Sequence, residues 1–106
     1  MSANIEYTVA AKADLREIIV FYAQTRDEDS ATLLIASIID EIEALADSPM
    51  LSNPVAGLPP QYRRWLIFKK RYIVYFERIT QDSIRVIRVY GAKRKPLNIF
   101  EILGKN

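Results

Sequence analysis

Two pairs of adjacent cations are the residues of this sequence best suited to chemistry. Arg63 and Arg64 stand next to each other in the middle of the chain, and Lys93 and Arg94 form a second pair near its end. Binding of phosphate needs cations aimed at the non-bridging oxygens, and the planar guanidinium of arginine makes that contact through two parallel hydrogen bonds. The two pairs therefore predict a surface for an anionic target, with Lys95 as a further contact.

Catalysis at these cations would have to proceed without the usual proton-transfer groups. The 106 residues include no histidine and no cysteine, which removes the imidazole base, the thiolate nucleophile and the commonest transition-metal ligands. A metal-independent nuclease would use Arg63, Lys93 and Arg94 to stabilise charge on the scissile phosphate, with Tyr90 or Glu77 transferring the proton. We therefore expect binding rather than catalysis, with no metal and no cofactor. The alternative is that the cations only solvate strand ends and a turn.

Charge is divided unequally between the two halves of the chain. Residues 1–60 carry three basic and ten acidic side chains, whereas residues 61–106 carry twelve basic and three acidic ones. The halves have net charges of −7 and +9, although the whole chain has a net charge of only +2. This asymmetry is typical of a protein whose basic face meets nucleic acid or an acidic protein. The alternative is an acidic helical layer that merely lies beside a basic sheet.

The composition is that of one folded domain. Half of the residues are hydrophobic and 26% are charged, a balance typical of globular proteins, and 106 residues are too few for two separate cores. We therefore expect a single domain over residues 1–106.

The N-terminus lacks a basic segment followed by an apolar run, and no later stretch approaches the ~18 apolar residues of a membrane span. We therefore expect a cytoplasmic protein without membrane contact.

The first half of the chain predicts a strand followed by two helices. Apolar and polar residues alternate over residues 5–9, which is the period of a short half-buried strand. Two stretches with helical spacing of apolar residues follow, on either side of the polar segment 25–30. Thr8 is placed to cap the first helix, and Asp29 or Ser30 to cap the second. The apolar positions are Leu15, Ile18, Ile19 and Tyr22 in the first helix and Leu34, Ile38, Ile42 and Leu45 in the second.

The second half predicts a three-stranded antiparallel meander. Residues 49–61 contain four of the five prolines, so we expect no regular element there. Strand-like runs follow at residues 63–68, 72–78 and 84–90, and the middle run begins with five apolar residues, which predicts a central strand covered on both faces. The chain thus predicts an α+β fold in the order β-α-α-β-β-β, with both helices on one face of the sheet and a short C-terminal tail.

A further group of candidate contact residues is apolar. Trp65 stands at the start of the meander, where it is either a core residue or an anchor at an interface. Leu97, Phe100 and Leu103 lie in the apolar tail, which is either a short packing helix or a surface that a partner covers.

Several short motifs occur in order along nearly the whole chain. They are Ala13-Asp14-Leu15 followed by Ile18 and Tyr22, then Leu45 to Pro49 with Gly57, then Tyr62-Arg63-Arg64, then Tyr72-Ile73-Val74-Tyr75, and finally Val86-Ile87-Arg88-Val89-Tyr90-Gly91-Ala92-Lys93-Arg94. Together with the order of the elements, this collinear set resembles the ParE/RelE toxin superfamily.

The resemblance implies the toxin of a two-component toxin-antitoxin (plasmid stabilisation) module, held inactive by a cognate antitoxin that wraps it. ParE-like members of the superfamily target DNA gyrase, whereas RelE-like members cut messenger RNA in the ribosomal A site. The long acidic helical hairpin and the Val-Tyr-Gly-Ala-Lys-Arg segment are more similar to the ParE branch, so we expect a toxin that inhibits gyrase by binding. The alternatives are a RelE-like ribosome-dependent endoribonuclease and a non-toxic antitoxin-binding module.

Two departures from the superfamily pattern favour binding over catalysis. Many relatives have a histidine at or just before the glycine of the last motif, where this chain has Tyr90, and RelE-like nucleases often have a C-terminal tyrosine where the nearest aromatic residue here is Phe100. The predicted target-binding residues are Arg63, Arg64, Lys93, Arg94 and Lys95, and the predicted antitoxin-binding residues are Trp65, Leu97, Phe100 and Leu103.

Overall fold

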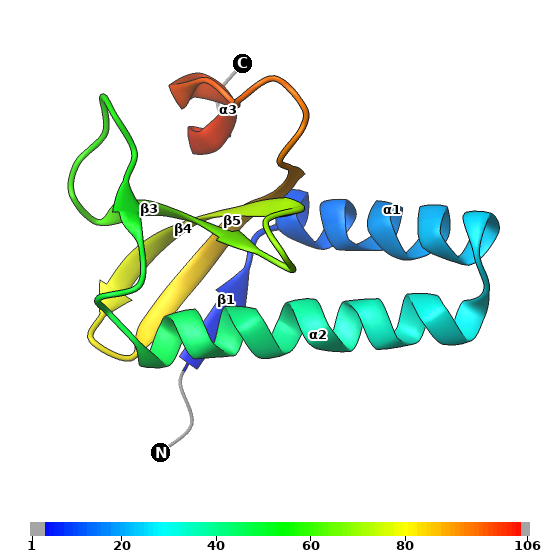
Figure 1. The fold of residues 1–106 in the computed structure, drawn as a ribbon. Helices are drawn as coiled ribbons and strands as arrows, with labels where there is room; N and C mark the ends of the chain where they lie inside the picture. Colours follow the sequence, from blue (N-terminus) through cyan, green and yellow to red (C-terminus); the bar gives the residue numbers. More distant parts are fainter. Residues whose placement is uncertain (1–3, 105–106) are drawn as a thin grey trace.

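The structure, a computed structural model that describes residues 4–104, is a mixed sheet with helices on both faces (Figure 1). In chain order its elements are β1 (Asn4–Tyr7), α1 (Val9–Thr25), α2 (Glu28–Asp47), β2 (Asn53–Pro54), β3 (Tyr62–Ile67), β4 (Tyr72–Thr80), β5 (Ser83–Gly91) and α3 (Ile99–Leu103). Helices α1 and α2 form an antiparallel hairpin, and α3 lies across the sheet from α2. The predicted α+β fold, a strand and a helical hairpin followed by an antiparallel meander, is confirmed.

The sheet has the strand order β1-β5-β4-β3-β2, with β4 at its centre. Strands β3, β4 and β5 form the antiparallel meander, whereas β1 returns to the far edge and pairs in parallel with β5, where Ile5 faces Ile84. The run from Ile73 to Phe76 in β4 is buried at every position. The prediction of a central strand covered on both faces is therefore confirmed.

Two hydrophobic cores lie on opposite faces of the sheet. The larger core joins the hairpin to the sheet, and its members include Ile38 and Ile42 of α2 and Phe76 of β4. The second core lies on the other face, where Leu97 and Ile102 of the C-terminal segment pack against β4. The apolar tail is therefore a short packing helix, which was one of the two predicted possibilities.

The sequence predicted the N-cap of α1 correctly but not that of α2. Thr8 caps α1 as predicted, because its hydroxyl accepts from the amide of Ala11 at 3.0 Å. Asp27, rather than Asp29 or Ser30, caps α2, so that prediction was wrong. The Asp27 carboxylate accepts from the amide of Ser30 at 2.7 Å, and this bond lowers the pKa of Asp27. The earlier start leaves Asp29 in the first turn, where the helix dipole favours negative charge.

The proline-rich loop contains one short regular element, which corrects the prediction that it would contain none. Asn53 and Pro54 form β2 and pair with Arg64 and Arg63 of β3. Proline fits here because β2 is an edge strand, whose outer side needs no amide donor.

No helix within residues 4–104 has the length and apolar character needed to cross a bilayer.

The Thr8 hydroxyl is predicted to contribute to stability through two bonds. It accepts from Ala11 and donates to the carbonyl of Ile87 at 2.8 Å, so it joins the start of α1 to β5. We expect Thr8→Ala to lower the free energy of unfolding by about 1–2 kcal/mol in urea titrations, as for other lost N-caps. Thr8→Ser keeps the hydroxyl and should retain most of this stability. Equal losses in both variants would contradict the assignment.

Candidate functional site: the basic end of the sheet

Two strand arginines are bound to the fold itself and are not free for a ligand. Arg63 donates from Nε to the hydroxyl of Ser52 at 2.8 Å and from Nη2 to its carbonyl at 2.9 Å. Arg78 donates to the carbonyls of Leu45 and Ala46 at 2.7 and 3.1 Å, which satisfies acceptors that the end of α2 leaves unpaired. Burial, together with the nearby charge of Arg63, lowers the pKa of Arg78. Both guanidinium groups therefore join the sheet to neighbouring segments.

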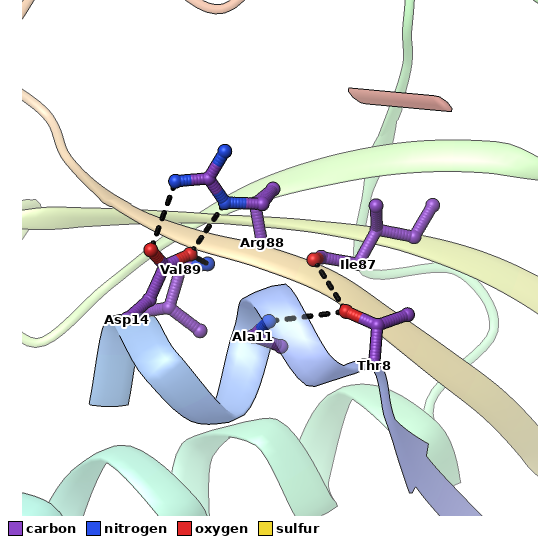
Figure 2. A network of polar contacts seen from close by, with 6 residues as sticks. All are labelled: Thr8, Ala11, Asp14, Ile87, Arg88 and Val89. Atoms are coloured by element: carbon purple, nitrogen blue, oxygen red, sulfur yellow. Dashed lines mark hydrogen bonds and ion pairs between the residues drawn. The ribbon is translucent and has the colours of Figure 1, made fainter. Parts of the chain in front are cut away.

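A third arginine, Arg88, joins α1 to the edge of β5 (Figure 2). Its Nε and Nη2 donate to the two carboxylate oxygens of Asp14 at 2.7 and 2.9 Å, and the same carboxylate accepts from the amide of Val89 at 2.9 Å. The hydrogen bonding of its guanidinium to the Asp14 carboxylate is the main cause of the raised pKa of Arg88. The side chains of Asp14 and Arg88 are only 11% and 24% exposed, so water does little to weaken the pair. Helix α1 thus occupies the edge of β5 beyond the end of β1.

We predict that loss of the Asp14 carboxylate is strongly destabilising. Asp14→Ala leaves a half-buried guanidinium and the amide of Val89 without their acceptor, and we expect a loss of about 2–3 kcal/mol in the free energy of unfolding. In a double-mutant cycle with Arg88→Met, the loss in the double variant should be smaller than the sum of the two single losses by about 1 kcal/mol or more. Strict additivity of the two variants in urea titrations would show that the pair makes no net contribution.

Five exposed cations gather at one end of the sheet. The turn between β3 and β4 lies beside the segment after β5, because Tyr72 pairs with Gly91 and the amide of Ala92 donates to the carbonyl of Arg71 at 2.8 Å. Together they surround an open cavity of about 500 Å³, and no carboxylate is among its lining residues. We name its five cations the basic end: Lys69, Lys70, Arg71, Lys93 and Arg94.

The basic end is exposed, and its charges have no acidic partner within residues 4–104. All five side chains are solvent-exposed, and none takes part in the ion pairs found within residues 4–104. The guanidinium groups of the two arginines lie over aromatic rings instead, Arg94 at 4.3 Å from the ring centre of Tyr90 and Arg71 at 5.8 Å from that of Phe68. Five like charges without counter-charges favour an anionic ligand.

The turn that carries three of these cations has an unusual backbone. Phe68, Lys69 and Lys70 have φ values of 51°, 55° and 65°, in the left-handed region that costs an L-residue roughly 1–2 kcal/mol. The carboxylate of Glu41 on α2 accepts from the amide of Phe68 at 2.8 Å, and the amide of Arg71 donates back to the carbonyls of Ile67 and Phe68 at 3.1 Å. Contacts from the rest of the fold therefore stabilise a turn that its own residues disfavour.

We predict that Glu41 stabilises this turn. Glu41→Ala removes the acceptor for the amide of Phe68 and should cost about 1–2 kcal/mol, with faster hydrogen exchange at that amide. Glu41→Gln keeps an acceptor oxygen and serves as the matched control. Unchanged protection of the Phe68 amide in Glu41→Ala would contradict this role.

The structure brings some of the predicted target-binding residues together and separates others. Lys93 and Arg94 belong to the basic end, and exposed Lys95 follows them. Arg63 lies at the opposite end of β3, four residues from Ile67 and thus about 13 Å from the turn. Arg64 lines a neighbouring cavity of about 280 Å³ beside β2, which Lys70 of the basic end also lines.

The predicted antitoxin-binding residues also differ in their surroundings. Trp65 packs partly against the larger core and also lines the cavity beside β2. Leu97 is buried in the second core, and Leu103 is half-buried. Phe100, by contrast, is 61% exposed, so it is the one of the four whose ring is largely free to meet a partner.

Sequence reasoning missed Lys69, Lys70 and Arg71 as site residues and treated them only as a turn. A signal was present, since in an antiparallel meander the first turn and the end of the third strand lie at the same end of the sheet. Of the two candidate proton-transfer residues, Glu77 is held in an ion pair, whereas the contact of Tyr90 involves the face of its ring and not its hydroxyl. The Tyr90 ring lies beneath Arg94, and Glu77 accepts from Arg85 at 3.0 Å. Within residues 4–104 no group of three or more acidic side chains could hold a metal ion.

Solved structures with the same fold define the class of protein. The chain is similar to a structure of the chromosomal ParDE toxin-antitoxin system of P. aeruginosa, with a TM-score of 0.72 and 18% identity over 87% of this chain and 98% of that one. It is also similar to the RelBE2 toxin-antitoxin complex of Mycobacterium tuberculosis, with a TM-score of 0.60 and 14% identity over 86% and 99% of the two chains. The isolated RelE toxin of E. coli gives a TM-score of 0.58 and 17% identity over 89% and 88%. The fold is that of the ParE/RelE toxins.

The family follows from the sequence. A family model described as the ParE toxin of the type II toxin-antitoxin system parDE matches residues 5–96, so this chain belongs to the ParE toxin family. Among curated proteins, no sequence matches the chain.

Proposed function

We propose that this chain is a ParE-like toxin that inhibits DNA gyrase by binding it and that a cognate antitoxin neutralises it. The observation that carries the proposal is the basic end, where five cations that form no ion pair within residues 4–104 surround one cavity. Such a site can bind an anionic surface, and no carboxylate or histidine lines it to serve as a general base. Lys93, Arg94 and Lys95 are the predicted target contacts that lie at or beside it.

A cognate antitoxin is the second partner in this proposal. The ParDE and RelBE2 structures that share this fold are of toxin-antitoxin systems, which supports such a partner here. The exposed ring of Phe100 and the cavity beside Trp65 are the proposed contacts. Leu97 and Leu103 would act mainly by packing α3 against the sheet.

A RelE-like endoribonuclease is the second candidate function. The similarity to the RelBE2 complex and to RelE favours it, because these structures share the fold at TM-scores of 0.60 and 0.58. The proposed phosphate-binding set for that reaction, however, combines Arg63 with Lys93 and Arg94, and Arg63 lies at the other end of β3. A chain that inhibits neither target would instead be a non-toxic antitoxin-binding module.

We predict that the purified chain inhibits DNA supercoiling by gyrase. The variant Lys93→Ala/Arg94→Ala/Lys95→Ala should lose this inhibition while each change alters stability by no more than ~0.5 kcal/mol, as expected of exposed residues. The variant Arg63→Ala should, by contrast, be less stable. It loses the bonds of Arg63 to Ser52, and its unfolding temperature should therefore fall.

The outcome that would contradict this function is equally specific. Codon-dependent cleavage of messenger RNA on ribosomes, with supercoiling unaffected, would favour the endoribonuclease. Normal growth when the chain is expressed without an antitoxin would favour the non-toxic module.

A further inference from the structure

We propose that the basic end is a binding site for the phosphate backbone of duplex DNA, so that the toxin contacts gyrase together with the DNA that gyrase holds. The inference rests on the gyrase function proposed above and specifies part of its target. It is carried by three features of the described residues: the density of unpaired charge, the limited aromatic surface in the cavity, and the fixed geometry of the turn.

The density of positive charge favours a polyanion over a protein surface. The five cations line one cavity of about 500 Å³, and no carboxylate lies among them. Protein surfaces usually intersperse charges of both signs, so five matching carboxylates rarely occur together. Duplex DNA instead presents one phosphate charge per ~1.7 Å of helix axis, whatever its sequence. A nucleic acid backbone is thus the ligand that most readily matches this cluster.

The aromatic residues at the site favour a duplex over a single strand. Single-stranded nucleic acids are bound largely by stacking of unpaired bases on exposed aromatic rings. Tyr72 lines the cavity, but its ring packs near that of Phe68 with centres 6.3 Å apart and is only partly exposed. The ring of Tyr90 is covered by the guanidinium of Arg94 at 4.3 Å. These two rings therefore offer only limited surface for base stacking, while the exposed ring of Phe21 lies in the neighbouring cavity that Arg94 also lines. The cations of the basic end can reach a backbone without any base being unstacked.

The backbone of the turn is held in place before any ligand arrives. Lys69 and Lys70 both have positive φ, a conformation that persists where surrounding contacts impose it and that clusters at functional sites. The Glu41 carboxylate fixes the start of the turn, and the bond from Ala92 to the carbonyl of Arg71 fixes its distance from the segment that carries Lys93. Positions set in advance reduce the ordering cost of binding.

The test is the binding of a fluorescently labelled 20-base-pair duplex to the purified toxin, followed by anisotropy over a series of salt concentrations. Contacts to four or five phosphates predict a slope of about −4 in log K against log salt, so that doubling the salt weakens binding about 16-fold. The variant Lys69→Gln/Lys70→Gln/Lys93→Gln should reduce the size of this slope by about 3. Glutamine has the same branching as lysine near the backbone, so the strain of the turn is unchanged.

A matched control removes the same charge from the helical layer. Lys12→Gln/Arg16→Gln/Arg26→Gln changes the net charge equally but leaves the basic end intact, and its slope should stay close to that of the unmodified chain. An equal reduction in the control would overturn the inference, because binding would then follow net charge alone. Tighter binding of a single-stranded RNA of the same length would also overturn it.

The outcomes separate this inference from the proposed function. Inhibition of gyrase without duplex binding would overturn the DNA site and leave the gyrase function standing. If the toxin binds the duplex and the lysine variant does not, but the toxin fails to inhibit gyrase, the DNA site is supported and the gyrase function is contradicted. As a further check, Glu41→Ala should weaken duplex binding while Glu41→Gln should not. Both variants remove one negative charge, so a merely electrostatic role of Glu41 would affect them equally.

Discussion

The carboxylate of Asp14 makes the interaction on which the geometry of the site depends. It accepts three bonds, two from Arg88 and one from the amide of Val89, and so supplies to β5 the edge partner that β1 is too short to provide. Beyond this point β5 continues to Tyr90, whose ring supports Arg94. A single acidic side chain of α1 therefore fixes the strand that leads directly to Lys93 and Arg94, two of the five cations of the basic end.

The chain uses its two kinds of cation for different purposes. Arginines such as Arg63, Arg78 and Arg88 lie within strands, where the rigid fork of the guanidinium satisfies two fixed acceptors at once. Lysines dominate the solvent-exposed turn, where a compact and strongly hydrated ammonium keeps its water until a ligand replaces it. The positive charge of the second half is thus partly structural, whereas the cations of the basic end form no ion pair within residues 4–104.

Periodicity predicted the elements well because burial imposes it on every strand and helix. Ile38 and Ile42 are buried because they lie on one face of a helix, and the first five residues of β4 are apolar because both faces of the strand are covered there. The cap at Asp27 was missed because three neighbouring side chains could all serve as an N-cap, and the choice depends on which one meets the amide of Ser30. Strand β2 was missed because proline is excluded from central strands but can occur in an edge strand.

The site could be predicted only in part, since charge alone does not reveal which cations are already paired. The sequence placed Arg63 beside Lys93 and Arg94 on the basis of residue type, whereas its bonds to Ser52 depend on how the proline-rich loop folds back along β3. Conversely, Lys69 and Lys70 had the appearance of an ordinary solvated turn. Their importance follows from strand pairing, which brings that turn to the end of β5.

The structure also shows that the two explanations of the charge asymmetry are compatible. Acidic residues of α2 such as Asp40, Glu43 and Asp47 are exposed on the helical layer, while the basic end lies at one end of the sheet. Few charges cross between the halves, the main links being Asp14 with Arg88 and Glu6 with Arg85. The separation is incomplete at the basic end itself, because Glu41 of α2 accepts from the amide of Phe68 and Glu17 of α1 lines a cavity together with Arg94. Some acidic side chains of the helices therefore lie beside the basic end, and Glu41 contributes to binding there by holding the turn that presents the lysines.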